Sequence, residues 1–180
     1  MGVGASDISD EAKKRHFSRY AAVIQLLKKE VGRNDLVADI GCGSGYGTNM
    51  LAQSFRRVIG IEPDDVARRY AAKHFPEVLF ANDLGELAAD VAVMIESIEH
   101  MSSGETRLYL KETRVLALTT PLLEHGWNDY HEQCFKKAED VHKYVGRWGF
   151  TVAGVRVHQG ITFTTGEHGN NLIALYKRSK

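Results

Sequence analysis

The sequence predicts a single α/β domain, with a mostly parallel sheet and helices on both of its faces. Two observations predict this fold class. Short apolar runs alternate with helix-patterned segments over the first two-thirds of the chain, the order that crossover units between parallel strands produce. The last third contains two strand-like runs with no helix between them, which indicates an antiparallel hairpin at one end of the sheet. A chain of 180 residues has room for one such core, so we expect residues 1–180 to form one domain.

The individual elements follow from hydrophobic spacing and from the residues that interrupt it. Apolar residues at helical spacing predict an amphipathic helix over about 10–31, and the apolar run at 36–40, stopped by glycines, predicts a buried strand. Pro121 is expected to close the strand at 115–119, and the Gly/Thr-rich residues 159–170 are expected to form a loop. The other expected elements are helix 45–54, strand 57–61, helix 64–74, strands 78–80 and 91–95, helix 104–113, helix 137–148, and strands 152–157 and 172–176.

Charge and composition restrict the partners and the compartment. Lys and Arg together number 23, as do Asp and Glu, whereas a protein that grips a phosphate backbone usually has a basic excess. We therefore expect a small-molecule partner rather than nucleic acid. No apolar run approaches the roughly 18–20 residues that span a bilayer, so no membrane is expected. Two cysteines, Cys42 and Cys134, are too few for a disulfide framework, so we expect a cytoplasmic protein. The oligomeric state does not follow from the pattern.

A glycine-rich loop joins the first expected strand to the helix after it. It reads Asp39-Ile40-Gly41-Cys42-Gly43-Ser44-Gly45, and glycines in such a loop permit positive φ and let a ligand approach the backbone. The dinucleotide fingerprint does not fit, because its third glycine would fall on Tyr46 or Thr48. A phosphate-binding Gly-Lys-Ser/Thr sequence does not follow either. The loop is therefore predicted to hold a nucleoside that lacks a pyrophosphate.

Acidic residues follow the next two expected strands. Glu62 ends the second strand, where a carboxylate can accept hydrogen bonds from both ribose hydroxyls. Asn82 and Asp83 follow the third strand, where either side chain can meet an adenine amino group. Each acid alone is more often a helix cap or a surface charge. Because the carboxyl ends of parallel strands share one rim of the sheet, the acids together with the glycine loop favour a nucleoside site.

With these motifs the chain resembles the class I S-adenosylmethionine-dependent methyltransferases, particularly the branch of ubiquinone-biosynthesis and sugar O-methyltransferases. The likeness covers about residues 16–150 and implies a Rossmann-like class I methyltransferase fold, with a seven-stranded, mostly parallel sheet and a C-terminal antiparallel hairpin. One departure is Lys111-Glu112-Thr113-Arg114, where the family usually has a Pro-Gly-Gly turn. The anchors of the likeness are residues 37–47, Gly60-Ile61-Glu62, Glu96-Ser97-Ile98-Glu99-His100, Thr119-Thr120-Pro121 and the aromatic stretch 127–135.

The resemblance implies a role for each matching residue toward S-adenosylmethionine. Loop residues would line its methionine and ribose, and Asp39 would hold the loop and reach the amino group. Glu62 would take the ribose hydroxyls, and Glu96 would lie near the methionine end. The N-terminal helical segment, residues 1–31, would pack over the site through Arg19 and Tyr20. The implied cofactor-binding residues are Tyr20, Asp39, Gly41, Cys42, Gly43, Gly45, Glu62, Asp83, Leu84 and Glu96.

Glu96, Glu99 and His100 have a spacing that could place them on one helical face. Glu-x-x-Glu-His resembles the metal-binding motif of ubiquinone-pathway methyltransferases and of small-RNA 3′-end 2′-O-methyltransferases, in which a later histidine, here His131, completes the site. The resemblance thus implies Mg²⁺ or Mn²⁺ held by Glu96, Glu99, His100 and His131. In the alternative, no metal binds, Glu96 serves the cofactor, Glu99 is solvated, and His100 acts as a general base or only as a cap. For methyl transfer to a hydroxyl, the expected catalytic base is His100 or His131.

These observations leave three functions open. The favoured one is O-methylation of a small molecule or a sugar-containing intermediate. The second is methylation of the terminal 2′-hydroxyl at an RNA 3′ end, which the glutamate and histidine motif favours and the neutral net charge disfavours. The third is a regulatory module that binds S-adenosylmethionine without catalysing methyl transfer.

Overall fold

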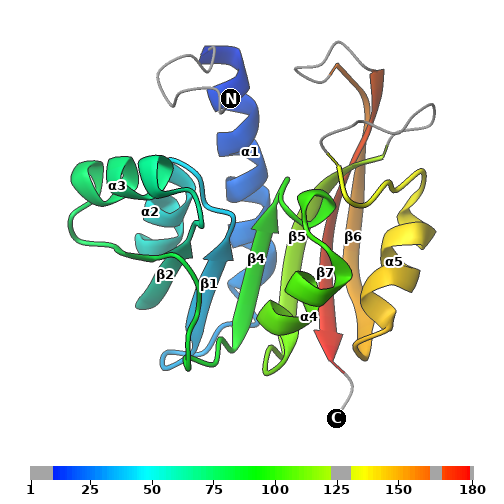
Figure 1. Cartoon of the computed structure of the whole chain (residues 1–180). Helices are drawn as coiled ribbons and strands as arrows, with labels where there is room; N and C mark the ends of the chain where they lie inside the picture. Colours follow the sequence, from blue (N-terminus) through cyan, green and yellow to red (C-terminus); the bar gives the residue numbers. More distant parts are fainter. Residues whose placement is uncertain (1–9, 123–130, 163–167, 179–180) are drawn as a thin grey trace.

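A computed structural model describes residues 10–122, 131–162 and 168–178. Its seven strands form one sheet in the order β3-β2-β1-β4-β5-β7-β6. All neighbouring strands are parallel except β7, which runs antiparallel to both β5 and β6. The expected seven-stranded, mostly parallel sheet with a terminal antiparallel pair is confirmed (Figure 1). The elements are α1 Asp10–Leu27, β1 Leu36–Ile40, α2 Tyr46–Ala52, β2 Arg57–Ile61, α3 Asp65–His74, β3 Leu79–Ala81, β4 Val91–Ile95, a 3₁₀ turn η1 Ile98–His100, α4 Ser103–Leu110, β5 Val115–Leu122, α5 Ala138–Gly146, β6 Phe150–Thr162 and β7 His168–Arg178.

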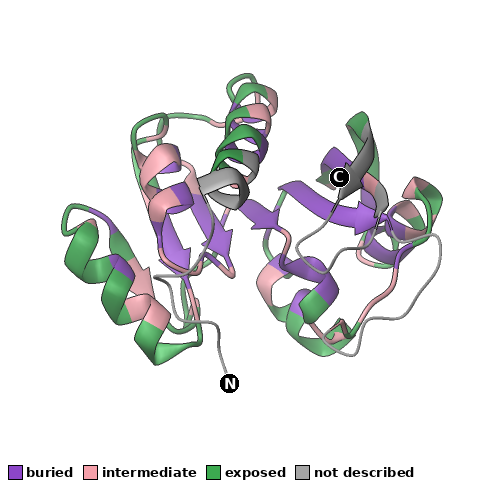
Figure 2. Ribbon diagram, turned by 90° about the horizontal axis from the view of Figure 1, so that it is seen from above, coloured by how far each residue is buried: buried purple, intermediate pink, exposed green. Residues whose placement is uncertain are grey.

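Two hydrophobic clusters cover the two faces of the sheet. On one face, α1 and α2 pack against alternate residues of the central strands, through side chains such as Leu27, Leu51 and Val93. On the other face, α4 and α5 do the same with residues that include Leu110, Val141 and Met94. The central strands β1, β4 and β5 and the inner sides of these helices are accordingly buried, whereas the described side chains of the edge strands β3 and β6 are more exposed (Figure 2). No helix in the described part of the chain is long and apolar enough to cross a membrane.

Two expectations about the end of the sheet were wrong. Pro121 does not close β5, which continues to Leu122. The pairing of β5 with β4 stops at Thr119, but β5 continues because β7 still pairs with Pro121 and Leu122 on its other side. The expected loop at 159–170 is also largely strand, since pairing of β6 with β7 resumes after an irregularity between His158 and Ile161. Of that loop, residues 163–167 lie outside the described residues.

The turn before β5 forms without the family's Pro-Gly-Gly sequence. Helix α4 ends at Leu110, three residues earlier than expected, and begins with a capping box between Ser102 and Glu105. At its other end the Thr113 hydroxyl donates to the carbonyl oxygens of Tyr109, at 3.1 Å, and Ala89, at 3.2 Å. The Thr113 hydroxyl therefore meets one carbonyl at the end of α4 and one in the segment before β4, and the chain turns into β5 without a glycine.

Gly47, in α2, provides a test of how α1 packs on the sheet. A Cβ at this position would lie 2.0 Å from the Tyr20 ring, whereas a Cβ at Gly146, in α5, would meet no atom within 4 Å. Gly47→Ala should therefore lower the free energy of unfolding by about 1–3 kcal/mol through overpacking. Gly146→Ala, the matched control, should leave it unchanged or raise it by up to about 1 kcal/mol. Urea denaturation measures both, and equal values for the two variants would contradict this packing of α1.

Candidate cofactor and methyl-transfer site

The predicted site residues gather where the parallel strands end. β1 lies between β2 and β4, so the chain leaves β1 toward one side of the sheet and later returns to the other side at β4. This is the switch in strand order at which open α/β sheets bind ligands. The loops after β1, β2 and β4 all open at this rim (Figure 1).

The three glycines of the loop after β1 have positive φ, but for different reasons. Gly41 and Gly45, at φ 74° and 81°, are packed closely, since a Cβ would lie 2.7 Å from Ser97 Cβ and 2.6 Å from Ala71 Cβ. Gly43, at φ 53°, has no atom within 4 Å of the Cβ position. Of these glycines, Gly43 is therefore the one whose Cα borders open space.

Glu62 lies across the glycine loop. Its Oε2 accepts a hydrogen bond from the Gly43 N–H at 2.8 Å, and its Oε1 accepts one from the Asp64 N–H at 3.0 Å. The bond from Gly43 places the Glu62 carboxylate beside the open side of the loop. The structure thus brings together the loop and the acid that the sequence predicted to share one ligand.

Asp39 ties the loop to two helices. Its carboxylate has no exposed surface and accepts hydrogen bonds from the Tyr20 hydroxyl, at 3.1 Å to each oxygen, and from the Thr48 hydroxyl at 2.7 Å. Burial raises the pKa of Asp39 to about 7, although the bonds from Thr48 and Tyr20 act in the opposite direction. Tyr20 is also buried, and its hydroxyl faces Asp39. The Cys42 thiol packs against Gly60, since a Cβ added at Gly60 would lie 2.9 Å from Cys42 Sγ.

A cavity of about 520 Å³ lies beside the residues expected to face adenine. Asp83 and Leu84 line it from the segment after β3, and Tyr109 lines it from α4. Asp83 is exposed, and its Oδ1 accepts a hydrogen bond from the Gly85 N–H at 2.7 Å. Burial, with the nearby charges of Asp83 and Glu105, raises the pKa of the Tyr109 hydroxyl.

Glu96 follows β4 and has φ 53°, which is unusual for a residue other than glycine. Its Oε1 accepts hydrogen bonds from the Thr119 hydroxyl at 2.9 Å and from Asn171 Nδ2 at 2.8 Å. Its Oε2 lies 3.6 Å from the guanidinium of Arg19, which is itself buried. Residues from α1, β5 and β7 therefore converge on one carboxylate at the end of β4.

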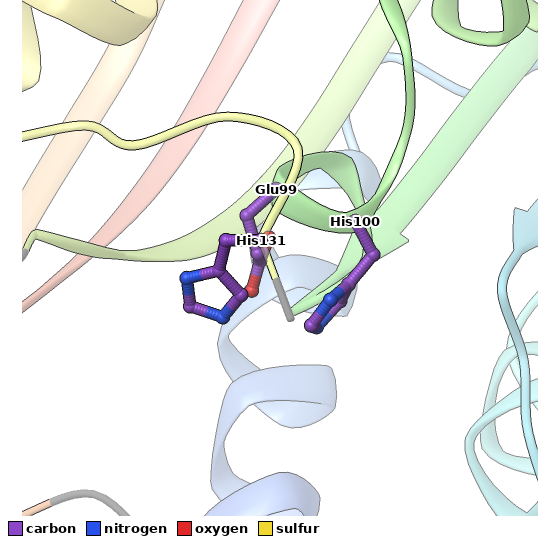
Figure 3. A group of neighbouring side chains, drawn as sticks. All are labelled: Glu99, His100 and His131. Carbon is purple, nitrogen blue, oxygen red and sulfur yellow. The ribbon is translucent and has the colours of Figure 1, made fainter. Parts of the chain in front are cut away.

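Glu99, His100 and His131 form a second group at the same rim (Figure 3). Each offers a ligand atom, and these atoms lie within 4.8 Å of one another. The alternative expectation of a solvated Glu99 is wrong, because its side chain is 2% exposed and accepts a hydrogen bond from the Thr120 hydroxyl at 3.1 Å. Burial, reinforced by the charge of Glu96, raises the pKa of the Glu99 carboxyl well above its ordinary value. The backbone N–H of Gln133 donates to the Glu99 carbonyl, which fixes the segment that carries His131.

The expected four-residue metal cluster is found only in part, because Glu96 lies outside the group of three. The expectation assumed one helical face for Glu96, Glu99 and His100. The chain instead leaves β4 with positive φ at Glu96 and forms only a single 3₁₀ turn over Ile98–His100, so the Glu96 carboxylate points to Thr119 and Asn171. Residues 127–130 of the expected aromatic stretch lie outside the described residues.

Sequence reasoning missed Thr48, Thr119, Thr120 and Asn171 as partners of the site carboxylates. Thr119 and Thr120 fell within a motif that the sequence singled out and Thr48 directly followed another, but nothing assigned their hydroxyls to an acid. Asn171 had no such signal. It stands at the start of an apolar strand, and only the antiparallel register of β7 against β5 brings it to Glu96.

Comparisons with known proteins agree on one family. A family profile described as a methyltransferase domain matches residues 37–146. A probable S-adenosylmethionine-dependent methyltransferase of Mycobacterium tuberculosis is 34% identical over 116 residues, which make up 58% of this chain and 42% of that protein. The chain thus spans less than half the length of this curated relative.

Solved structures show the same fold. Magnesium protoporphyrin IX methyltransferase from Synechocystis, with bound S-adenosylhomocysteine, has a TM-score of 0.70 at 19% identity, covering 98% of this chain and 90% of that one. The methyltransferase domain of a bacterial Hen1 protein has a TM-score of 0.62 at 19% identity, covering 90% of this chain and 97% of that one. At these identities the likeness concerns the fold.

The raised pKa of Asp39 predicts a pH dependence of stability. A carboxyl whose pKa is higher in the folded state stabilises the fold when protonated, so this contribution is lost as pH rises from about 4 to about 7. Asp39→Asn removes the titration. Relative to this variant, the wild type should lose at most about 4 kcal/mol of unfolding free energy between pH 4 and pH 8, measured by urea denaturation. If the difference in unfolding free energy stayed constant, or if the wild type became relatively more stable, the hydrogen bonds from Tyr20 and Thr48 would outweigh the effect of burial on the pKa of Asp39.

Proposed function

This chain belongs to the class I S-adenosylmethionine-dependent methyltransferases, and we propose that it transfers the cofactor's methyl group to an oxygen atom of a small molecule or a sugar-containing intermediate. The observation that carries the proposal is the group of Glu99, His100 and His131 at the strand ends where the glycine loop and Glu62 also lie. Cofactor-binding groups and groups able to accept a proton thus share one rim of the sheet.

The described residues fit the cofactor. Open space above Gly43 leaves room for a ligand against the backbone, as a Cβ there would meet no atom within 4 Å. Glu62, bonded to the Gly43 N–H, is placed to accept the ribose hydroxyls on that side. Asp83 and Leu84 border the adenine end, and Glu96 borders the methionine end. Asp39 and Tyr20 act beneath the loop, where their mutual hydrogen bonds fix its conformation.

Methyl transfer requires alignment more than elaborate chemistry. When bound, S-adenosylmethionine supplies a methyl group on a positively charged sulfur. The protein's part is to hold the acceptor oxygen in line with that methyl group, and orientation of this kind can contribute on the order of 7–11 kcal/mol. His100 is exposed and His131 is half-buried, so an acceptor can reach both rings. One of these histidines would accept the hydroxyl proton as the carbon–oxygen bond forms and the carbon–sulfur bond breaks, with S-adenosylhomocysteine as the leaving group.

A second candidate function is 2′-O-methylation at an RNA 3′ end with the help of a metal ion. The convergence of Glu99, His100 and His131 favours it. A metal ion held by these two imidazoles and one carboxylate would orient a hydroxyl and lower its pKa, and the imidazole ligands suit Mn²⁺ better than Mg²⁺, which prefers oxygen. For Glu96 to join them, its carboxylate would have to leave Thr119 and Asn171. The zero net charge favours the small-molecule acceptor.

Cofactor binding is the first consequence to test. S-adenosylhomocysteine should bind with a dissociation constant in the micromolar range, about −8 kcal/mol, by titration calorimetry. Gly43→Val should abolish binding, because its side chain would occupy the open space above the loop. Glu62→Ala should weaken binding by about 1–3 kcal/mol through the lost ribose hydrogen bonds. Glu77→Ala, an exposed acid before β3, is the matched control and should bind normally. Unchanged affinity in both site variants would reject the proposed cofactor site.

One assay of methyl transfer decides both the class of acceptor and whether a metal ion is required. Labelled S-adenosylmethionine is offered with a pool of hydroxyl-bearing small molecules or with short RNAs, each with and without a chelator. We expect label in the small-molecule pool with or without chelator, and His100→Ala should slow transfer by about 10²–10⁴-fold if His100 is the base. Transfer to RNA 3′ ends that chelator abolishes and Mg²⁺ or Mn²⁺ restores would establish the second candidate instead. Full activity of both His100→Ala and His131→Ala in chelator would show that these histidines act neither as the catalytic base nor as metal ligands.

A further inference from the structure

Asn171, at the start of the apolar part of β7, is a polar residue in a buried strand. It is 1% exposed, and the residues that follow it, from Leu172 to Tyr176, are apolar and buried. It also lies outside residues 37–146, the part of the chain that matches the methyltransferase family profile. Its amide Nδ2 donates a 2.8 Å hydrogen bond to Oε1 of Glu96, 75 positions away in the sequence.

The fold alone does not account for this asparagine. Its Oδ1 is buried without a hydrogen-bond partner among the described residues. A buried acceptor that gives up water and gains no donor destabilises the folded state, so an apolar side chain of similar size would suit the strand better. The bond to Glu96 is the contact that only a polar side chain at this position provides.

Glu96 itself has φ 53°, which is unfavourable for a residue with a Cβ, and strained backbone of this kind is concentrated at functional sites. The two hydrogen bonds that its carboxylate accepts from described residues, Asn171 and Thr119, both fall on Oε1. Oε2 lies 3.6 Å from Arg19, beyond ordinary hydrogen-bond distance. Two bonds on one oxygen fix the carboxylate plane and leave the other oxygen to meet a ligand donor.

We infer that Asn171 is a positioning residue that holds the Glu96 carboxylate for the positively charged amino group at the methionine end of the cofactor. The inference rests on the proposed function, in which Glu96 borders that end of S-adenosylmethionine. It assigns the C-terminal hairpin a part in cofactor binding, through a residue that never touches the cofactor itself.

A double-mutant cycle on S-adenosylhomocysteine binding tests the inference. Asn171→Asp replaces the donor with a second carboxylate against Oε1, which should weaken binding by about tenfold or more by calorimetry. In the Glu96→Gln background the same change should cost less than about twofold, because the Gln side chain can donate to the new carboxylate. Asn34→Asp makes the same charge change at the amino end of β1 and should bind as the wild type does. Equal costs of Asn171→Asp in the two backgrounds would overturn the inference.

Stability distinguishes positioning from a structural role. Asn171→Leu removes the donor and the unpaired acceptor together, so its thermal midpoint should equal or exceed that of the wild type while its affinity falls by about fivefold. A lower midpoint with unchanged affinity would show that Asn171 serves the fold and would overturn the inference. If the wild type binds S-adenosylhomocysteine and both Asn171 variants bind it equally well, the inference fails while the proposed function stands. If the wild type does not bind, the proposed function fails.

Discussion

Two carboxylates near the ends of neighbouring strands, those of Asp39 in β1 and Glu96 after β4, constrain the whole site. Asp39 lies near the end of β1, just before the glycine loop, and has no exposed surface. A buried carboxylate is tolerated only where hydrogen-bond donors satisfy it. Tyr20 and Thr48 supply those donors, which fixes α1 and α2 relative to β1. Arg19, the residue before Tyr20 in α1, lies 3.6 Å from the carboxylate of Glu96, which follows β4. One helix is therefore held against both sides of the switch in strand order, and the glycine loop keeps its shape between them.

The site combines two parts of the chain, one inside and one outside the region that matches the methyltransferase family. Strands β1, β2 and β4, within the region that matches the methyltransferase family, carry the loop and the acids. The C-terminal hairpin lies outside that region, yet its strand β7 reaches Glu96. Such an arrangement follows from the sheet order, since β7 is inserted beside β5 and its residues come level with the end of β4. The hairpin thus completes both the sheet and the surroundings of the methyl-transfer end.

Sequence patterns predicted the buried parallel strands well. The bounds of β1, β2 and β4 agree with expectation, because each is a short apolar run between residues that stop it. The hairpin was harder, since glycine and threonine in 159–170 indicate a loop, whereas cross-strand pairing with a long neighbour extends both strands. The spacing of Glu96, Glu99 and His100 also misled, because it presumes a helix where the backbone turns with positive φ. Asn171 was unpredictable, as its contact depends on register between strands far apart in sequence.

The most direct test of this account is a crystal structure of the protein with S-adenosylhomocysteine. The account predicts the ribose hydroxyls within hydrogen-bond distance of Glu62, the ligand lying over Gly43, and the amino group of the methionine end beside Glu96. Asp39 should remain beneath the loop, still bonded to Tyr20 and Thr48. A ligand bound elsewhere on the sheet, or one bound at this rim while Glu62 makes no contact with its ribose, would contradict the account.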